Sequence, residues 1–419
     1  MSTTIRRVLW VRALRAFADG YVSLVLPVYL ISLGFTAFRV GVIATATLLG
    51  SAALSLGVGM IAHRAGYRTL LIAATVLMAA TGFAFAAAND FWPLFIIAVV
   101  GTLNPSSGDV SVFLPLEQSL LAHSVEDAKR TSIFARYSLV GALVGALGAL
   151  FAGAPDFAVK LLHVEQKMAL QAMFVLYGAI GIVSAIVYRK LPASHASEAR
   201  TAAAPLGKSR RIVFTLAALF SLDAFGGGFV VQSMLALWLF ERFDLSTAVA
   251  GTIFFWSGVF SAVSYLVAVR IAKRIGLVNT MVFTHLPANL MLVAMPFVPD
   301  LAWVIVLLLA RSALSQMDVP TRGSYVMAVV TPAERPAAAS FTSVPRSLAS
   351  AVSPLLAGAM LGVSTFGWPL LIAGVTKIVY DVSLLASLAR SGRRRRQRPQ
   401  RSAKSLSASR VPRLGSLGC

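Results

Sequence analysis

His63-Arg64-Ala65-Gly66 lies between two long apolar stretches, and a related motif, Lys273-Arg274-Ile275-Gly276, lies between two others 210 residues later. Arg136 and Arg346 are related by the same offset. Because the chain has 419 residues, this offset divides it into two equal parts. Self-similarity over such a distance indicates that two copies of one structural unit make up the chain.

The composition is that of a membrane protein. Hydrophobic residues make up 58% of the chain and charged residues 13%, and the mean hydropathy is +0.79. Soluble domains carry about a quarter charged residues, and a membrane-crossing helix needs about 20 apolar residues. The apolar stretches lack the alternation of barrel strands, so we predict an all-α polytopic bundle. The predicted spans are residues 8–33, 38–62, 68–89, 92–121, 131–154, 168–189, 211–241, 247–271, 277–298, 301–330, 338–362 and 365–389.

The basic residues predict the orientation. Most of the 37 Lys and Arg residues lie in the N-terminus, the tail and the loops that follow even-numbered spans, whereas Arg39, Lys160, Lys167 and Arg242 lie on the opposite face. By the positive-inside rule both termini are cytoplasmic, in an inner membrane. The net charge of +21 therefore reports topology and does not indicate a nucleic-acid partner. We expect an N-terminal six-helix bundle at 1–189, a cytoplasmic linker at 190–210, a C-terminal six-helix bundle at 211–390 and a basic, disordered cytoplasmic tail at 391–419.

Several classes of function lack their signatures in this sequence. There is no Gly-x-x-x-x-Gly-Lys-Ser/Thr loop, so the chain has no ATPase of its own. No nucleophile–base arrangement and no metal-ligand spacing is visible. The only cysteine, Cys419, excludes an internal disulfide. We therefore expect no enzyme activity, no metal and no cofactor.

Ionisable residues inside the spans are the candidate functional residues, because each normally faces the bundle interior or a cavity. Asp223 lies about 18 Å into its helix at 1.5 Å per residue, and Gly226-Gly227-Gly228 after it favour unwinding. It is the first candidate for a proton or cation site; a polar helix-packing role is the alternative. Asp19 is a second candidate, with an Arg15–Asp19 pair at the membrane boundary as the alternative.

The spans 92–121 and 301–330 are unusually polar and are broken by Pro105 and Pro320. Proline removes a backbone hydrogen bond and permits a kink, so these spans are predicted to line a cavity or to bend. Pairs Asp109–Arg136 and Asp318–Arg346 are expected, as a charge relay, an anchor for an anionic substrate, or permanent salt bridges within each half. The candidates in these spans and the spans that follow them are Asp109, Glu117, Arg136, Arg311, Gln316, Asp318, Arg322 and Arg346.

Three further residues inside the spans are interpreted as structural. Lys377 and Asp381 are four residues apart on one helix face and predict an internal neutralising pair. His285 is the only histidine that falls inside a span and is expected to be a polar packing residue.

Residues 59–68 resemble the loop signature between helices 2 and 3 of the major facilitator superfamily, Gly-x-x-x-Asp-Arg-x-Gly-Arg-Arg/Lys. Gly59, Arg64, Gly66 and Arg68 fit this signature, while His63 stands where the signature has Asp. With six plus six spans and a cytoplasmic linker, the resemblance covers about residues 8–390. It implies the 12-helix fold of that superfamily and a gating loop at these five residues. In the family the Asp helps to latch the two halves, so His63 predicts a differently built latch.

The resemblance and the charges together imply a secondary active transporter. It would move a small organic solute by alternating access, with export favoured over uptake and with Asp223 or Asp318 carrying a coupling proton. Its partners would be the solute, protons and the lipid bilayer, and it would act as a monomer. The alternative is a transporter-derived receptor or scaffold that no longer cycles, for which His63 and the basic tail are the support.

Overall fold

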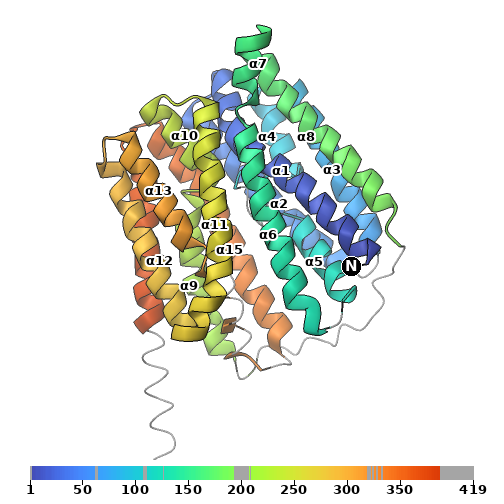
Figure 1. Ribbon diagram of the computed structural model, residues 1–419, viewed down its shortest axis with the longest axis vertical. Helices are drawn as coiled ribbons and strands as arrows, with labels where there is room; N and C mark the ends of the chain where they lie inside the picture. The colour runs from blue at the N-terminus through green and yellow to red at the C-terminus, as the bar shows by residue number, and fades with distance from the viewer. Residues whose placement is uncertain are drawn as a thin grey trace, which may run out of the picture.

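The chain folds as a bundle of helices (Figure 1). The computed structural model describes residues 2–61, 65–106, 111–125, 127–192, 207, 209–318, 322, 325–326, 329–331 and 334–386. Within these residues all regular structure is helical. Ten described helices are long and apolar enough to cross a membrane, and two shorter apolar helices, Phe91–Val100 and Leu301–Ser315, accompany them. They fall on the twelve predicted spans, so the prediction of a polytopic helical bundle is confirmed.

The first half of the chain forms six membrane crossings, and its fourth crossing is divided. The segment around Asn104 and Pro105 interrupts the helix that the apolar run 92–121 would otherwise form, as the proline predicts. The fifth crossing continues into a short helix beyond its apolar run. The elements are α1 Thr3–Ser32, α2 Ala37–Ile61, α3 Tyr67–Ala87, α4 Phe91–Val100, α5 Phe113–His123, α6 Asp127–Phe151, α7 Ala154–Leu162 and α8 Gln166–Arg189.

The second half also forms six crossings. Its first crossing is divided, directly after the three glycines. Here α9 ends at Gly228 and α10 begins at Gln232, as the weak helix propensity of glycine predicts. Most of the predicted linker 190–210 and the whole tail 391–419 lie outside the described residues. The elements are α9 Arg210–Gly228, α10 Gln232–Phe243, α11 Thr247–Ile275, α12 Leu277–Ala294, the 3-10 turn η1 Met295–Phe297, α13 Leu301–Ser315, α15 Arg335–Leu361 and a last helix, Trp368–Ala386.

The two divided crossings, one from each half, meet each other. The backbone N–H of Ser233, at the start of α10, donates a hydrogen bond to the carbonyl of Pro105 across 3.0 Å. Backbone groups freed where a helix is interrupted at membrane depth need such a partner, because lipid offers none. The interruptions are therefore part of the contact between the halves.

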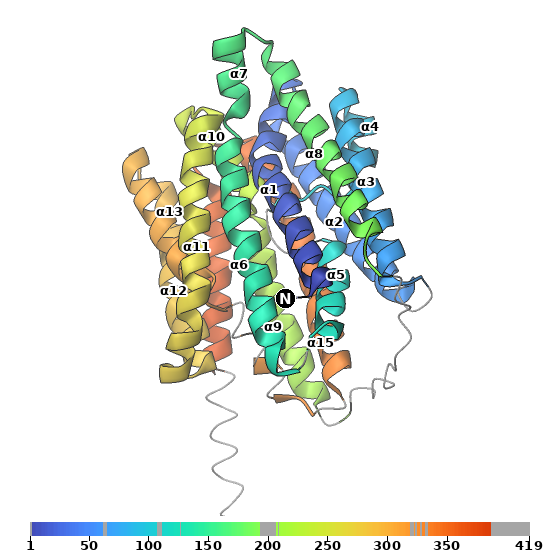
Figure 2. The ribbon, with the colours of Figure 1, turned by 45° about the vertical axis from the view of Figure 1, so that its right-hand side comes forward.

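The halves pack closely at the end of the bundle that carries α7 (Figures 1 and 2). A Cβ atom at Gly41 of α2 would lie 2.4 Å from the carbonyl oxygen of Pro354 in α15. Similarly, a Cβ at Gly251 of α11 would lie 2.6 Å from the carbonyl oxygen of Ala149 in α6. Small residues thus let the helix backbones of the two halves touch. We call this the α7 end, and the opposite end, where α8 finishes and α9 begins, the linker end.

Candidate functional site

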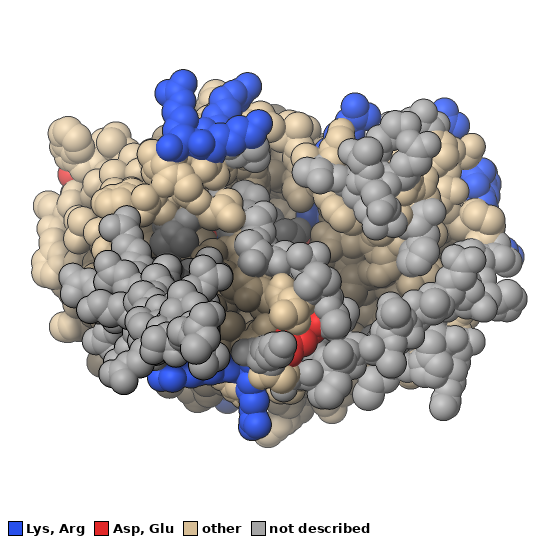
Figure 3. Space-filling model, turned by 90° about the horizontal axis from the view of Figure 1, so that it is seen from below, with Lys and Arg blue, Asp and Glu red and all other residues tan. Residues whose placement is uncertain are grey.

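A cavity of about 860 Å³ lies between the two halves of the bundle. Its wall includes residues of α2, α5 and α6 from the first half and of α9 to α13, α15 and the last helix from the second. Seen from the linker end, the surface is hollowed between the two sides (Figure 3). Cavities of about 300–1,000 Å³ are typical of small-molecule sites. The volume therefore suits a small organic solute.

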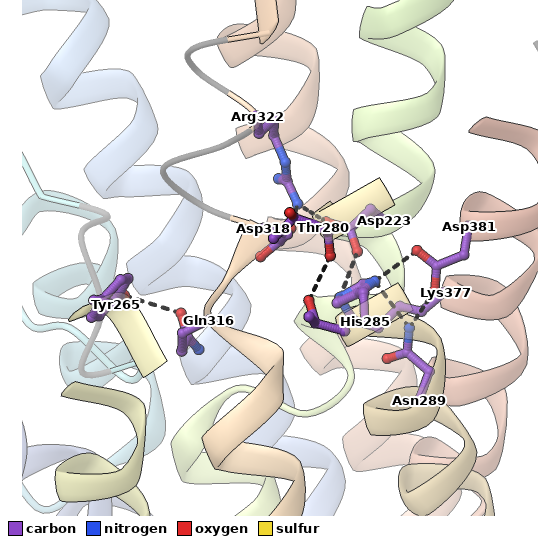
Figure 4. Close-up of polar contacts among 11 residues, drawn as sticks. Asp223, Tyr265, Thr280, His285, Asn289, Gln316, Asp318, Arg322, Lys377 and Asp381 are labelled. Carbon is purple, nitrogen blue, oxygen red and sulfur yellow. Dashed lines mark hydrogen bonds and ion pairs between the residues drawn. The ribbon is translucent and has the colours of Figure 1, made fainter. Parts of the chain in front are cut away.

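Asp223 on the cavity wall accepts from two cations that come from different segments (Figure 4). Lys377 Nζ of the last helix donates to its Oδ1 atom and Arg322 Nη2 donates to its Oδ2 atom, each across 2.7 Å. All three side chains are buried in the bundle. One carboxylate thus holds the last helix and the segment after α13 against α9.

A second carboxylate lies behind this cluster and is joined to it by His285. The imidazole Nδ1 is 2.9 Å from Asp381 Oδ1, and Nε2 is 3.8 Å from Asp223 Oδ1. Asn289 Nδ2 donates to Asp381 Oδ2 across 2.9 Å and fixes that carboxylate on its other side. The ring therefore stands between a carboxylate on the cavity wall and one that is fully buried (Figure 4).

The same wall carries two residues of the predicted polar span 301–330. Asp318 accepts a hydrogen bond from Arg322, four residues further along the chain. Gln316 Oε1 accepts from the Tyr265 hydroxyl of α11 across 3.0 Å. The Asp318–Arg346 pair predicted from the repeat does not form; Arg322 takes the place of Arg346 because the i,i+4 spacing brings it to the same carboxylate.

Two cavity arginines have no such partner. Arg311 of α13 and Arg346 of α15 both line the cavity, and neither makes a hydrogen bond or an ion pair with another residue in the described part of the chain. The Nε atom of Arg311 is also buried with no acceptor nearby. Charged groups inside a membrane protein normally pair with one another, so these two stand out.

The family comparison agrees with this architecture. The model of the Major Facilitator Superfamily matches residues 8–316 and 219–417. The chain belongs to this superfamily. Its fold is thus that of secondary transporters, and its family is one of transporters rather than enzymes.

A sequence relative and several solved structures resemble this chain at low identity. An uncharacterized membrane protein of Saccharomyces cerevisiae is 23% identical over 416 residues, which cover 90% of this chain and 92% of that protein. A mutant of the nucleoside transporter NupG gives a TM-score of 0.73 at 13% identity and covers 92% of this chain and 99% of its own. The human organic anion transporter MFSD10 gives a TM-score of 0.63 at 17% identity and covers 92% of this chain and 100% of its own.

A bacterial homologue of the human lysosomal transporter Spinster, in an inward-facing and occupied conformation, gives a TM-score of 0.69 at 14% identity. It covers 93% of this chain and 96% of its own. At such identities the likeness shows the fold alone.

The superfamily loop signature is described only in part. Gly59 lies near the end of α2, Gly66 directly precedes α3, and Arg68 lies in the first turn of α3. His63 and Arg64 lie outside the described residues, as does the predicted pair partner Asp109. The latch and the Asp109–Arg136 pair therefore stay predictions.

The predicted candidates of the first half that are described do not gather at the cavity. Glu117 is fully buried and accepts from Arg15 Nη2 across 3.0 Å and from the hydroxyls of Tyr137 and Tyr188. Arg15 thus pairs with a carboxylate 102 residues away in the chain. Asp19 is buried and Arg136 is exposed, and neither contributes to the cavity wall.

Sequence reasoning misjudged Lys377 and His285. The predicted Lys377–Asp381 pair is wrong: Lys377 reaches Asp223 instead, and Asp381 is satisfied by His285 and Asn289. His285 was expected only to pack, but it lines the cavity and joins two carboxylates. The sequence did carry one sign that Lys377 and His285 belong to the site: both lie inside predicted spans, and an ionisable residue inside a span is a functional candidate by default.

Proposed function

We propose that this protein is a proton-coupled secondary transporter that moves a small organic solute by alternating access. Residues 8–189 would rock against residues 211–389 around the central cavity, with 190–210 as the linker between two bundles, 1–189 and 211–390. The close backbone contacts at the α7 end and the hollow at the linker end support this motion, because they are what one of its two end states requires.

The observation that carries the proposal is the sharing of Asp223 by Lys377 and Arg322. A proton taken up by Asp223 removes the negative charge that holds both cations. The last helix and the segment at Arg322 then lose their common tie to α9. Protonation of Asp223 thereby changes both the position of the last helix relative to α9 and the charge of the cavity. A proton-driven transport cycle needs such a coupling. Asp381 and His285 lie directly behind Asp223 and offer a route for the proton.

The charge distribution and the cavity support a proposal for the membrane, the orientation and the direction of transport. We place the protein in an inner membrane as a monomer with both termini cytoplasmic, because the basic residues gather on that face. The cavity then opens toward the cytoplasm. In export, this state loads the solute from the cytoplasm, and protons return through Asp223.

Proteoliposomes test the coupling. Solutes that the protein handles are first found by comparing accumulation in a deletion strain and in the same strain with the gene restored, over a panel of metabolites and toxins. An imposed pH gradient should then drive flux of a positive solute, and Asp223→Asn should abolish that flux while the variant still inserts into the membrane. The control is Asp300→Asn, which changes an exposed carboxylate away from the cavity where Asn still caps α13. Normal gradient-driven flux in Asp223→Asn would contradict the proposal.

A protein that does not cycle gives a different result. Single cysteines on the cavity wall should be accessible from each side of the membrane in turn if the protein alternates. Accessibility from one side only, under every gradient and solute, would favour the receptor or scaffold.

A further inference from the structure

Arg311 and Arg346 are the cavity cations that the proton-coupling network does not use. Both line the wall, and among the described residues neither has a carboxylate partner. The Nε donor of Arg311 is buried without an acceptor. Arg311 is half-buried and Arg346 is exposed, so both can meet a solute in the cavity. Charged groups inside a membrane protein normally pair with an opposite charge, so two cavity arginines without a carboxylate indicate a counter-charge that the protein itself does not supply.

The other described cations of the wall are already engaged. Lys377 and Arg322 hold Asp223, and Arg322 also holds Asp318. The guanidinium of Arg12 lies over the Tyr137 ring at 4.8 Å from its centroid. Among the described lining residues, five cations therefore face two carboxylates, and Arg311 and Arg346 supply most of the excess.

Arg311 and Arg346 also lie at one depth. Arg311 is ten residues into α13, about 15 Å, and Arg346 is eleven residues into α15, about 16 Å, at 1.5 Å per residue. The two helices cross the membrane in opposite directions and start at opposite ends. Both side chains therefore fall near the middle of a hydrocarbon core of about 30 Å, where superfamily solutes bind between the halves.

The remainder of the wall is rich in hydroxyl groups and poor in aromatic rings. Twelve serines are among its described residues, whereas Phe254 and Tyr265 are the only Phe, Tyr or Trp side chains among them. Two of these serines, Ser257 and Ser312, hydrogen-bond to each other across 2.7 Å, and Ser312 directly follows Arg311 in the chain. Among its described residues, such a wall offers many hydrogen bonds to hydroxyl groups and few aromatic rings on which a flat solute would stack.

We infer that the transported solute is a small hydroxylated organic anion whose carboxylate or phosphate binds Arg311 and Arg346. The planar guanidinium forks match either group through paired N–H donors. The serine hydroxyls bind the hydroxylated part of the solute. This inference rests on the proposed transport function and specifies its substrate class.

Binding to the purified full-length protein in nanodiscs tests the inference without any gradient. The probes are gluconate and glucose 6-phosphate, with glucose as the neutral partner of the same size and uridine as a neutral solute with a flat ring. We expect at least one of the two anions to raise the thermal unfolding temperature in a saturable way, and glucose and uridine to leave it unchanged. The comparison of gluconate with the phosphate decides which anionic group the arginines prefer. Stabilisation by glucose or uridine, or by neither anion, overturns the inference.

Variants assign the binding to the two arginines. Arg311→Gln and Arg346→Gln should each weaken binding of the anion about 10- to 100-fold, as expected for losing hydrogen bonds to a charged group. Arg311→Lys keeps the positive charge and so serves if Arg311→Gln does not fold. It should still weaken binding of the anion, because lysine lacks the planar guanidinium fork. Arg136→Gln is the matched control, since Arg136 is the repeat counterpart of Arg346 and lies away from the cavity wall. Unchanged affinity in both Arg311→Lys and Arg346→Gln contradicts the inference.

The two proposals fail in different ways. An anion that binds with these effects but is not driven by a pH gradient would disprove proton coupling and leave the substrate class standing. Gradient-driven flux of a neutral solute that no anion inhibits would disprove the substrate class and leave the transport function standing.

Discussion

Lys377 donates a hydrogen bond to Asp223 across 2.7 Å, from the last helix to α9. These residues are 154 positions apart in the chain, and both are buried. The last helix and α9 are therefore tied to each other at the wall of the cavity, and the strength of that tie depends on the charge of one carboxylate. Asp223 keeps a second cation, Arg322, on its other oxygen.

Removing one partner of this pair should destabilise the protein. Lys377→Met leaves Asp223 with Arg322 as its remaining cation. Breaking a buried pair in this way lowers the free energy of unfolding by about 3–5 kcal/mol. We expect the lower end of this range, because Arg322 still pairs with Asp223. We expect a lower thermal unfolding temperature for the purified variant in detergent.

The double variant separates the pair from the packing. In Lys377→Met combined with Asp223→Asn, the loss of stability should be smaller than the sum of the two single losses, because neither member of the pair is left charged without the other. Additive losses would mean that the two side chains stabilise the fold independently of each other.

Glu117 is predicted to stabilise the first half of the bundle and to take no part in solute binding. Glu117→Gln leaves the buried guanidinium of Arg15 without its carboxylate, and we expect a loss of about 3–5 kcal/mol. Tyr188→Phe removes one hydrogen-bond donor to Glu117 and should lower the free energy of unfolding by about 1–3 kcal/mol. Solute affinity measured on the folded fraction should stay within about twofold, since Glu117 is not on the cavity wall. A loss of affinity larger than the loss of stability would place Glu117 in the transport cycle instead.

The helices were predictable from the sequence because hydropathy and helix breakers act locally. The apolar runs 211–241 and 92–121 were expected to cross the membrane, and the structure has helices there. Three consecutive glycines after Asp223 were expected to weaken a helix, and α9 ends at Gly228. No partner from elsewhere in the chain is needed to reach these conclusions.

The charge partners were predictable only where they are near in sequence. Asp318 and Arg322 are four residues apart and do pair. Lys377 has an equally spaced carboxylate, Asp381, but Asp223 competes for it from another helix. Which acceptor wins depends on how the helices pack around the cavity, and the position of His285 and Asn289 beside Asp381 is likewise a result of packing. A single sequence carries no signal for such distant contacts.

Glu334 is predicted to stabilise the linker end in a way that depends on pH. Its carboxylate accepts hydrogen bonds from Ser209 and from the backbone N–H of Gly207, and these lower its pKa from 4.5 to about 2. Because the pKa in the folded protein is below that in the unfolded chain, the stabilisation is complete above about pH 4.5 and is lost as the pH falls toward 2.

The unfolding temperature of purified protein, measured from pH 6 down to about pH 3, tests this prediction. Glu334→Gln should lower the unfolding temperature at pH 6. The difference from the parent protein should shrink at acid pH, because Glu334 of the parent protein is then protonated and loses the charge that Gln never had. A gap that stays constant over this range would show that the carboxylate charge is not what stabilises the contact between residue 334 and the start of α9.

Gly41 is predicted to hold the bundle in the conformation that is closed at the α7 end. A Cβ atom there would lie 2.4 Å from the Pro354 carbonyl oxygen and 3.0 Å from Gly358 Cα, so Gly41→Val should force α2 and α15 apart. Gly57→Val is the control in the same helix, because a Cβ at Gly57 meets no atom within 4 Å.

A single cysteine on the cavity wall, Ser347→Cys in a protein with Cys419→Ser, reports the outcome. In the parent protein and in Gly57→Val, a membrane-impermeant maleimide should label it mainly from the linker side of the membrane. In Gly41→Val, labelling from the α7 side should rise several-fold, because the seal between the halves at that end no longer closes. If Gly41→Val folds and labels like Gly57→Val, the contact between α2 and α15 is not the barrier that closes the cavity, and the packing of α6 against α11 around Gly251 must carry that role alone.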